Sequence, residues 1–205
     1  GSGADGVRTV LYAPTWIGPY ADTDVYSLPV GADLVRALLA RGVRVVFRAH
    51  PLNYTKPVGT ELVEEIQAIL AEDAAATGRA HLWGEAAEID LTVEECFNLS
   101  DAMVCDVSAV VSDYLQSGKP MAIMAMGHDP AEILDLVPAA RAAYVIPRSL
   151  DGLEERLDEL LETDPLAAER VEMRRYYLGD FPADSYAEGF LEAARRHVDE
   201  PPRAH

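Results

Sequence analysis

Residues 102–125 read AMVCDVSAVVSDYLQSGKPMAIMA: an apolar run, a helical segment and a second apolar run. Ala102–Cys105 and Pro120–Ala125 are short and continuously apolar, which is typical of strands buried on both faces of a parallel sheet. Ala109–Gln116, between them, has helical spacing and stops before Gly118. A strand, a crossover helix and a second strand make up the parallel unit of α/β proteins. This stretch therefore predicts a parallel sheet with helices on its faces.

The same alternation continues on both sides of this unit. Further strands are expected at Val7–Ala13, Val43–Arg48, Ala80–Trp83 and Ala143–Ile146. Helices are expected at Asp33–Arg41, at Thr60–Ala76, after the Thr92-x-x-Glu95 capping box, at Leu150–Glu162, at Pro165–Tyr176 with Asp164 as its cap, and at Tyr186–Val198 after Ser185-x-x-Glu188. The sequence thus predicts a doubly wound, Rossmann-like α/β domain of about six strands over residues 7–198. Residues 1–6 are interpreted as a cloning remnant and flexible start, and 199–205 as a flexible tail.

Length and charge narrow the range of functions. The 205 residues are enough for one domain, and 17 Lys+Arg against 35 Asp+Glu give a net charge of −18. Such a balance argues against binding of nucleic acid or anionic lipid, because both require clustered cations. The sequence has no run of about 18 apolar residues, so direct insertion into a membrane is not predicted. Cys96 and Cys105 lie in apolar contexts and are expected to be buried thiols in a reducing compartment.

Several common chemistries have no motif in the sequence. CxxC, HExxH, GxxxxGK[ST] and GxSxG are all missing, so zinc, P-loop and α/β-hydrolase mechanisms have no support. The GSGADG start precedes the first strand, which is the wrong side for a dinucleotide-binding turn. Asp22 and Asp24 have no further carboxylates beside them for a metal site. No metal and no cofactor is demanded by the sequence.

In open α/β sheets, ligands bind beyond the carboxyl ends of the strands. His50-Pro51 follows the second strand, and the proline favours extended backbone at His50, which fixes the direction of the imidazole. The histidine could hold a phosphate or could be a solvated loop residue. Asp106-Val107-Ser108 lies between strand and helix, where it could form an anion site or simply cap the helix.

The other candidates at this edge are less distinctive. Thr15 and Trp16 follow the first strand, where they could line a pocket or be plain loop residues. Asp113 lies near the middle of the Ala109–Gln116 helix. Its carboxylate could belong to the site, or it could simply face solvent or pair with a lysine. The long connection Pro14–Val30 is expected to be functional or mobile because of its length.

These motifs together resemble the CDP-glycerol glycerophosphotransferases, the teichoic acid polymerase and primase family. The resemblance rests on Val10–Trp16 (VLYAPTW), on Arg48–Pro51 (RAHP), on Ser100–Ser108 (SDAMVCDVS) leading to Asp113–Pro120 (DYLQSGKP), and on Tyr177–Asp180 (YLGD). It covers about residues 8–195. The family's TDYSS is replaced here by CDVSA at Cys105–Ala109, without the tyrosine and the second serine.

The resemblance implies the C-terminal, nucleotide-binding half of a two-domain GT-B enzyme. It implies that His50, as a catalytic residue, and Ser108 grip the pyrophosphate of a CDP-glycerol donor, with Thr15 and Asp106 as further donor-phosphate residues and Asp113 and Trp16 in supporting positions. It also implies a polymer or lipid-linked acceptor held by an N-terminal domain missing from this chain, in the cytoplasm at the inner face of the membrane.

Three functions follow as hypotheses. The first is the donor half of a glycerophosphotransferase for teichoic acid or a related cell-surface polymer. The second is another GT-B transferase with a CMP-sugar or other nucleotide-sugar donor, since capsule polysialyltransferases also show an HP pair and a serine motif. The third is a non-catalytic domain that keeps the fold, which the altered CDVSA segment and the charge of −18 would fit. This chain alone is expected to catalyse nothing, because the other half would hold the acceptor.

Overall fold

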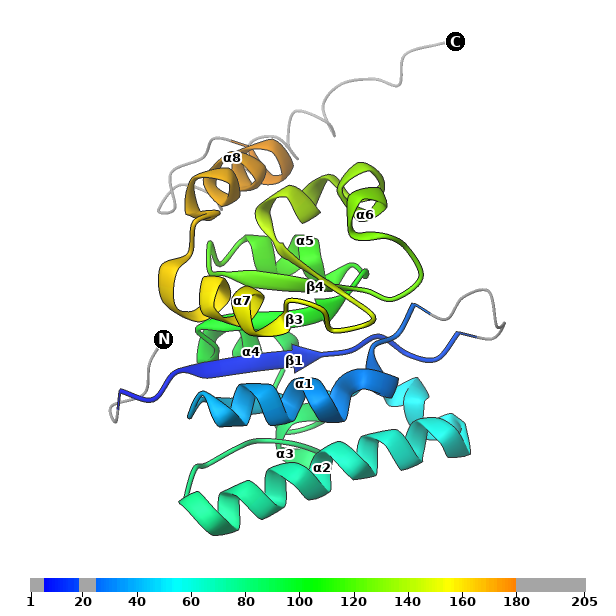
Figure 1. The fold of residues 1–205 in the computed structure, drawn as a ribbon. Coiled ribbons are helices and arrows are strands. Elements are labelled where there is room, and N and C mark those ends of the chain that lie inside the picture. Colours follow the sequence, from blue (N-terminus) through cyan, green and yellow to red (C-terminus); the bar gives the residue numbers. More distant parts are fainter. Residues whose placement is uncertain (1–5, 19–24, 180–205) are drawn as a thin grey trace, which may run out of the picture.

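The centre of the molecule is a five-stranded parallel sheet in the order β2-β1-β3-β4-β5. This computed structural model describes residues 6–18 and 25–179. The strands are β1 (Thr9–Ala13), β2 (Arg44–Phe47), β3 (Ala102–Asp106), β4 (Met121–Ala125) and β5 (Tyr144–Pro147). From β1 the chain runs first to β2 at one edge and then back across β1 to β3. Figure 1 shows β1, β3 and β4 in this order across the sheet. The strand order therefore reverses between β1 and β3, which confirms the doubly wound parallel sheet.

Helices cover both faces of the sheet. One face is covered by α1 (Leu28–Ala40), α2 (Pro57–Thr77), α7 (Leu153–Asp158) and the π-helical turn Glu159–Thr163. The other face is covered by α3 (Glu85–Glu88), α4 (Val93–Leu99), α5 (Val110–Leu115), α6 (Pro130–Leu136), the 3-10 turn Pro138–Ala142 and α8 (Ala167–Leu178). A further 3-10 turn, Pro51–Thr55, links β2 to α2.

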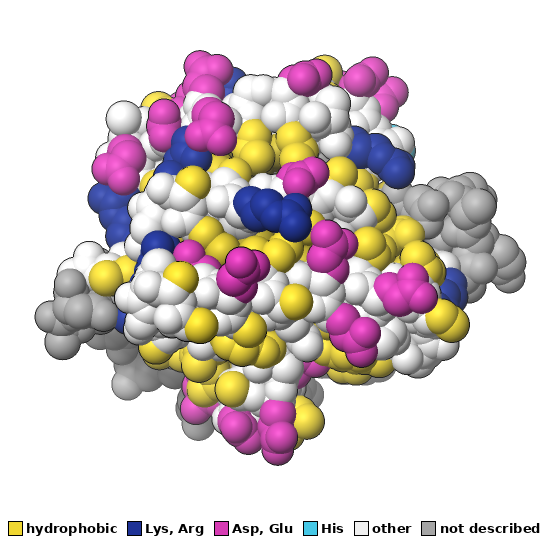
Figure 2. Space-filling model, turned by 60° about the horizontal axis from the view of Figure 1, so that its bottom comes forward, with side chains coloured by type: hydrophobic (Ala, Val, Ile, Leu, Met, Phe, Trp, Pro, Cys, Tyr) yellow, Lys and Arg dark blue, Asp and Glu magenta, His cyan; other side chains and the backbone are white. Residues whose placement is uncertain are grey.

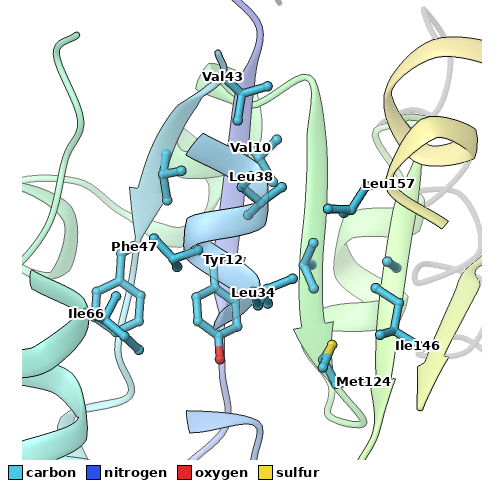
Figure 3. Close-up of a cluster of buried hydrophobic side chains, with 14 of the residues drawn as sticks. Val10, Tyr12, Leu34, Leu38, Val43, Phe47, Ile66, Met124, Ile146 and Leu157 are labelled. Carbon is cyan, nitrogen blue, oxygen red and sulfur yellow. The ribbon is translucent and has the colours of Figure 1, made fainter. Parts of the chain in front are cut away.

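The two faces form two separate cores because side chains alternate along each strand. Val10 and Tyr12 of β1 point to the α1 and α2 side, whereas Leu11 points to the α4 and α5 side. Figure 3 shows the first of these cores, in which Tyr12 lies beside Phe47, their ring centroids 5.5 Å apart. β3 and β4 are buried along their whole length, as expected for central strands of a parallel sheet covered on both sides, whereas β1, β2 and β5 each include partly exposed residues.

The predicted strand Ala80–Trp83 forms only an isolated bridge between Leu82 and Val46 at the outer edge of β2. The side chain of His81 explains why no regular strand forms here. In a regular sheet the Val45 amide would donate to a carbonyl of the next strand, but here it donates to Nδ1 of the buried His81 at 3.0 Å. The other ring nitrogen of His81 lies 2.8 Å from Oδ2 of Asp73. An imidazole therefore replaces the sixth strand along part of this edge.

Some helix boundaries also differ from expectation. α1 begins at Leu28, five residues before the predicted start, and α3 and α6 were not predicted. The prediction that Asp164 caps a helix beginning at Pro165 is wrong, because α8 begins at Ala167 and Asp164 has a left-handed backbone, with φ 44°. Its carboxylate instead pairs with the buried Arg170. The predicted helix Tyr186–Val198 and the tail lie outside the described residues.

Candidate functional site

A cavity of about 480 Å³ opens at the carboxyl ends of β1, β2 and β3. Four segments line it: Ala13–Trp16 after β1, Arg48–Pro51 after β2, Ser108–Val110 after β3, and α4 through Val93 and Phe97. Leu11 forms part of the floor. This is the point where the strand order reverses, which is where open α/β sheets bind ligands. Most of the residues that line the cavity are apolar and a few are polar, a composition common to small-molecule sites.

The structure brings four of the six candidate residues together. Thr15, Trp16, His50 and Ser108 all line the cavity, although 93 residues of sequence separate the first from the last. They meet because the carboxyl ends of neighbouring parallel strands share one edge of the sheet. Asp106 and Asp113 do not line this cavity. Asp113 lies on a separate hollow of about 400 Å³ between α4 and α5, with Glu94 and Gln116.

His50 has the extended backbone expected before a proline, with φ −71° and ψ 134°. Its Nδ1 accepts a hydrogen bond from the Leu52 amide at 3.2 Å, which assigns the proton of the neutral ring to Nε2. Partial burial lowers the pKa of His50 and so favours the neutral ring. The indole of Trp16 lies beside it, with ring centroids 6.3 Å apart. His50 therefore presents a hydrogen-bond donor, not a free base.

Ser108 lies just before α5, whose N-cap is Ala109. Within the described residues no side chain caps this helix, so neither Ser108 nor Asp106 has the capping role considered from the sequence. Ser108, Ala109 and Val110 instead form one wall of the cavity. With six residues, α5 is too short for a strong helix dipole, and any anion binding here would depend on the local polar groups.

Asp106 lies at the end of β3, buried and outside the lining of the cavity. Its Oδ2 accepts hydrogen bonds from the backbone amides of Thr15 at 2.7 Å and Ser27 at 3.0 Å. Burial raises the pKa of Asp106 to about 7, although those hydrogen bonds act in the opposite direction. This geometry corrects the expectation of direct phosphate contact, because the carboxylate faces the backbone of the β1–α1 connection.

The cavity differs in charge from the rest of the molecule. Acidic side chains are scattered over the face shown in Figure 2, in keeping with the net charge of −18. Among the described residues, none that lines the cavity is acidic, and Arg48 and His50 are its ionisable members. The Arg48 guanidinium donates to the carbonyls of Ala87 and Leu91. The residues that line the cavity thus offer hydrogen-bond donors and a guanidinium to an anion, and none of these lining residues is a carboxylate.

The other two cations considered near this edge have structural roles. Lys56 donates to the carbonyl of Gly18 at 2.6 Å, beside the cavity. Lys119 lies at the opposite, amino end of the sheet, where its amine donates to the carbonyls of Phe97 and Ser100 at 2.7 and 2.6 Å. It therefore cannot contribute to a site at the carboxyl edge.

Sequence reasoning missed Asn53, which is fully buried in the turn after β2. Its side chain accepts from the Ile17 amide at 3.1 Å and donates to the Thr15 carbonyl at 3.3 Å. The apolar wall formed by Val93, Phe97 and Val110 was also missed. An asparagine three residues after a histidine has no pattern of its own, and only the folded turn shows its role.

The described residues include no helix long and apolar enough to cross a membrane. Within 6–18 and 25–179 there is also no group of three or more His, Cys, Asp or Glu side chains that could hold a metal ion.

Solved structures with the same fold are distant in sequence. The chain is similar to trehalose-6-phosphate synthase from E. coli, bound with UDP-2-fluoro glucose (13% identity, TM-score 0.59, 97% of this chain, 46% of that one). It is similar to S. aureus MnaA with UDP (16% identity, TM-score 0.57, 97% of this chain, 49% of that one). It is also similar to the wall teichoic acid polymerase TagF (14% identity, TM-score 0.50, 94% of this chain, 44% of that one). The chain therefore spans about half the length of each. These similarities show the fold, one half of a GT-B architecture.

Sequence comparison is more specific. No curated protein sequence matches the chain significantly. The family model for CDP-glycerol:poly(glycerophosphate) glycerophosphotransferase matches residues 3–130, which include β1 to β4 and every segment that lines the cavity. The Tyr177–Asp180 part of the expected resemblance lies beyond that range. Since the match covers more than half of the sequence, the chain belongs to the CDP-glycerol:poly(glycerophosphate) glycerophosphotransferase family.

Proposed function

We propose that this chain is the donor-binding half of a glycerophosphotransferase and that the cavity holds the diphosphate of CDP-glycerol. The observation that carries the proposal is the convergence of Thr15, His50 and Ser108 around a cavity without acidic lining, in a chain of net charge −18. Family membership supports the reaction class. The nucleotides named for similar structures are uridine nucleotides, so the cytidine donor rests on the family alone.

In this proposal His50 acts as a hydrogen-bond donor. Its Nε2–H would donate to a phosphate oxygen, and its Nδ1 is already occupied by the Leu52 amide. Stabilisation of charge on the diphosphate is the main contribution such a site makes to transfer. The hydroxyl of the acceptor attacks the β-phosphorus, the bond from that phosphorus to the bridging oxygen breaks, and CMP leaves with the electron pair. The proton of the hydroxyl passes to a base outside the His50 ring.

Replacement of His50 tests the site. His50→Ala is expected to weaken binding of CDP-glycerol and CMP roughly 10- to 150-fold, because a hydrogen bond to a charged group contributes about 1.5–3 kcal/mol. Isothermal titration calorimetry at pH 7.5 measures the change. His128→Ala is the matched control, since His128 follows β4 at the same edge of the sheet but outside the cavity. Equal affinity of His50→Ala and the parent would show that the phosphates bind elsewhere.

Donor identity is tested with a panel on the parent chain: CDP-glycerol, a CMP-sugar and a UDP-sugar. The proposal predicts the tightest binding for CDP-glycerol. A preference for either sugar nucleotide would keep the site and change the donor. Binding of none of them at millimolar concentration would favour a non-catalytic domain.

Turnover is expected to need the other half of the enzyme. The chain spans 44–49% of the three similar structures described above, and the proposed acceptor, a polymer or lipid-linked chain at the inner face of the membrane, would be held by a second domain. A general base must lie within hydrogen-bond reach of the acceptor hydroxyl. We expect the chain alone to bind donor without releasing CMP from CDP-glycerol in the presence of a primed acceptor. CMP release by this chain at the rate of a two-domain protein would contradict that expectation.

A further inference from the structure

Both backbone groups of Thr15, at the cavity wall, are held by buried side chains from other segments. The amide donates to Oδ2 of Asp106 at 2.7 Å. The carbonyl accepts from Nδ2 of Asn53 at 3.3 Å. Asp106 ends β3 and Asn53 belongs to the turn after β2, and neither side chain is exposed to solvent. The peptide groups on either side of the Thr15 side chain are therefore fixed from two directions.

The same two side chains reach further along the connection that follows β1. Asp106 also accepts from the Ser27 amide at 3.0 Å, just before α1, and Asn53 accepts from the Ile17 amide at 3.1 Å. Trp16 lies between the two residues that Asn53 binds. Its indole position beside His50 thus depends on backbone contacts made at Thr15 and Ile17.

The position of Asn53 is fixed by the 3-10 turn Pro51–Thr55, to which it belongs, and by α2. Its backbone amide donates to the His50 carbonyl at 2.9 Å, which links the backbone of Asn53 to that of His50. α2 approaches this turn closely at Gly59, where a Cβ atom would lie 2.3 Å from the Asn53 carbonyl oxygen. A residue larger than glycine at 59 would push the turn away. The close contact between Gly59 and the Asn53 carbonyl therefore fixes Asn53, and through it Thr15.

We propose that Asn53 and Asp106 are positioning residues, which hold Thr15 and Trp16 at the wall of the cavity and so set ligand affinity without touching the ligand. The proposal rests on the proposed function for its ligand. Affinity depends on placement, because a ligand bound by a preorganised wall does not have to order that wall. Loss of the Asn53 or Asp106 side chain frees one of the Thr15 peptide groups and lets the Trp16 indole move away from the His50 ring.

The test uses Trp16 as its own reporter. In a Trp83→Phe background, Trp16 is the one remaining tryptophan of the sequence. Asn53→Ala and Asp106→Ala are compared with the background in three measurements: acrylamide quenching of tryptophan emission, affinity for CMP and for inorganic pyrophosphate, and urea unfolding. Asp106→Asn is the conservative variant, since its amide oxygen still accepts from Thr15. Ser100→Ala is the matched control, because Ser100 is a buried polar residue bonded to Tyr114 at the other end of the sheet.

Asn53→Ala and Asp106→Ala are expected to bind both probes about tenfold more weakly, a loss of roughly 1.4 kcal/mol in binding, and to expose Trp16 to quenching. Asp106→Asn is expected to resemble the background more closely in affinity and in quenching. Ser100→Ala is expected to lose stability without a change in affinity or in quenching. Should Asp106→Ala fail to fold, Asn53→Ala decides.

The two proposals fail separately. Unchanged quenching and unchanged affinity in Asn53→Ala would overturn the positioning roles while leaving the phosphate site intact. A background protein that binds neither probe would overturn the proposed function. In that case the quenching of Trp16 still decides whether the two side chains hold the cavity wall, and an unchanged Trp16 would overturn the positioning proposal as well.

Discussion

Asp164→Asn should lower the free energy of unfolding by about 3 kcal/mol, the lower end of the usual cost of leaving a buried charge without its partner, because the Asp164 side chain is itself 31% exposed. Arg170 is 1% exposed, and its guanidinium donates to both carboxylate oxygens of Asp164 and to the carbonyls of Gly118 and Ala142. The Tyr144 hydroxyl donates to the same carboxylate at 2.9 Å. Asparagine tolerates the left-handed backbone of Asp164, so the variant removes charge with little added strain.

Urea unfolding of Asp164→Asn, Arg170→Met and the double variant measures the coupling. The double variant should be more stable than Asp164→Asn, because it no longer buries an unpaired cation. Glu162→Gln is the control: it breaks the exposed Arg8–Glu162 pair and should change stability by less than about 0.5 kcal/mol. An effect of Asp164→Asn no larger than that of Glu162→Gln would show that the carboxylate does not stabilise the docking of α8.

The second large effect is a dependence of stability on pH that comes from Asp106. Burial raises the pKa of this carboxyl from 3.8 to about 7 in the folded chain. Between these values the folded state binds a proton that the unfolded state has lost, so stability falls as the pH rises through this window. One pKa unit corresponds to about 1.4 kcal/mol, which gives a total of up to about 4 kcal/mol.

Comparison with Asp106→Asn isolates this contribution from those of the other acidic residues. The stability of the variant relative to the parent should increase from pH 4 to pH 7 and then level off. Urea titrations at half-unit intervals of pH measure the difference. A constant difference across that range would mean that Asp106 is ionised in the folded chain throughout, and that the Thr15 and Ser27 amides outweigh its burial.

The sheet could be predicted because its strands are short, continuously apolar and bounded by clear turn signals. The edge at Ala80–Trp83 could not, since an apolar run does not show that His81 will take the place of a strand carbonyl at Val45. α6 does have a start signal in the sequence, with Pro130 at its first position and a capping box between Asp129 and Glu132. Its brevity made it resemble a loop.

The site was predictable as far as strand ends determine it. His50, Ser108 and Thr15 follow directly on three neighbouring strands, so the parallel sheet alone places them together. Asp106 was assigned to the ligand because a polar residue at a strand end looks accessible, whereas the fold buries it. Asn53 was missed because its partners, Thr15 and Ile17, are distant in sequence and are backbone groups.

The contrast between an acidic molecule and a cavity without acidic lining has a kinetic consequence. An anion that approaches this chain crosses a repulsive field before it reaches any favourable contact, so its capture is slowed at low ionic strength. Salt at 0.1 M shortens the range of that field to about 10 Å, while contacts inside the cavity are screened far less. For this chain, moderate salt therefore speeds the arrival of an anion, the reverse of electrostatic steering.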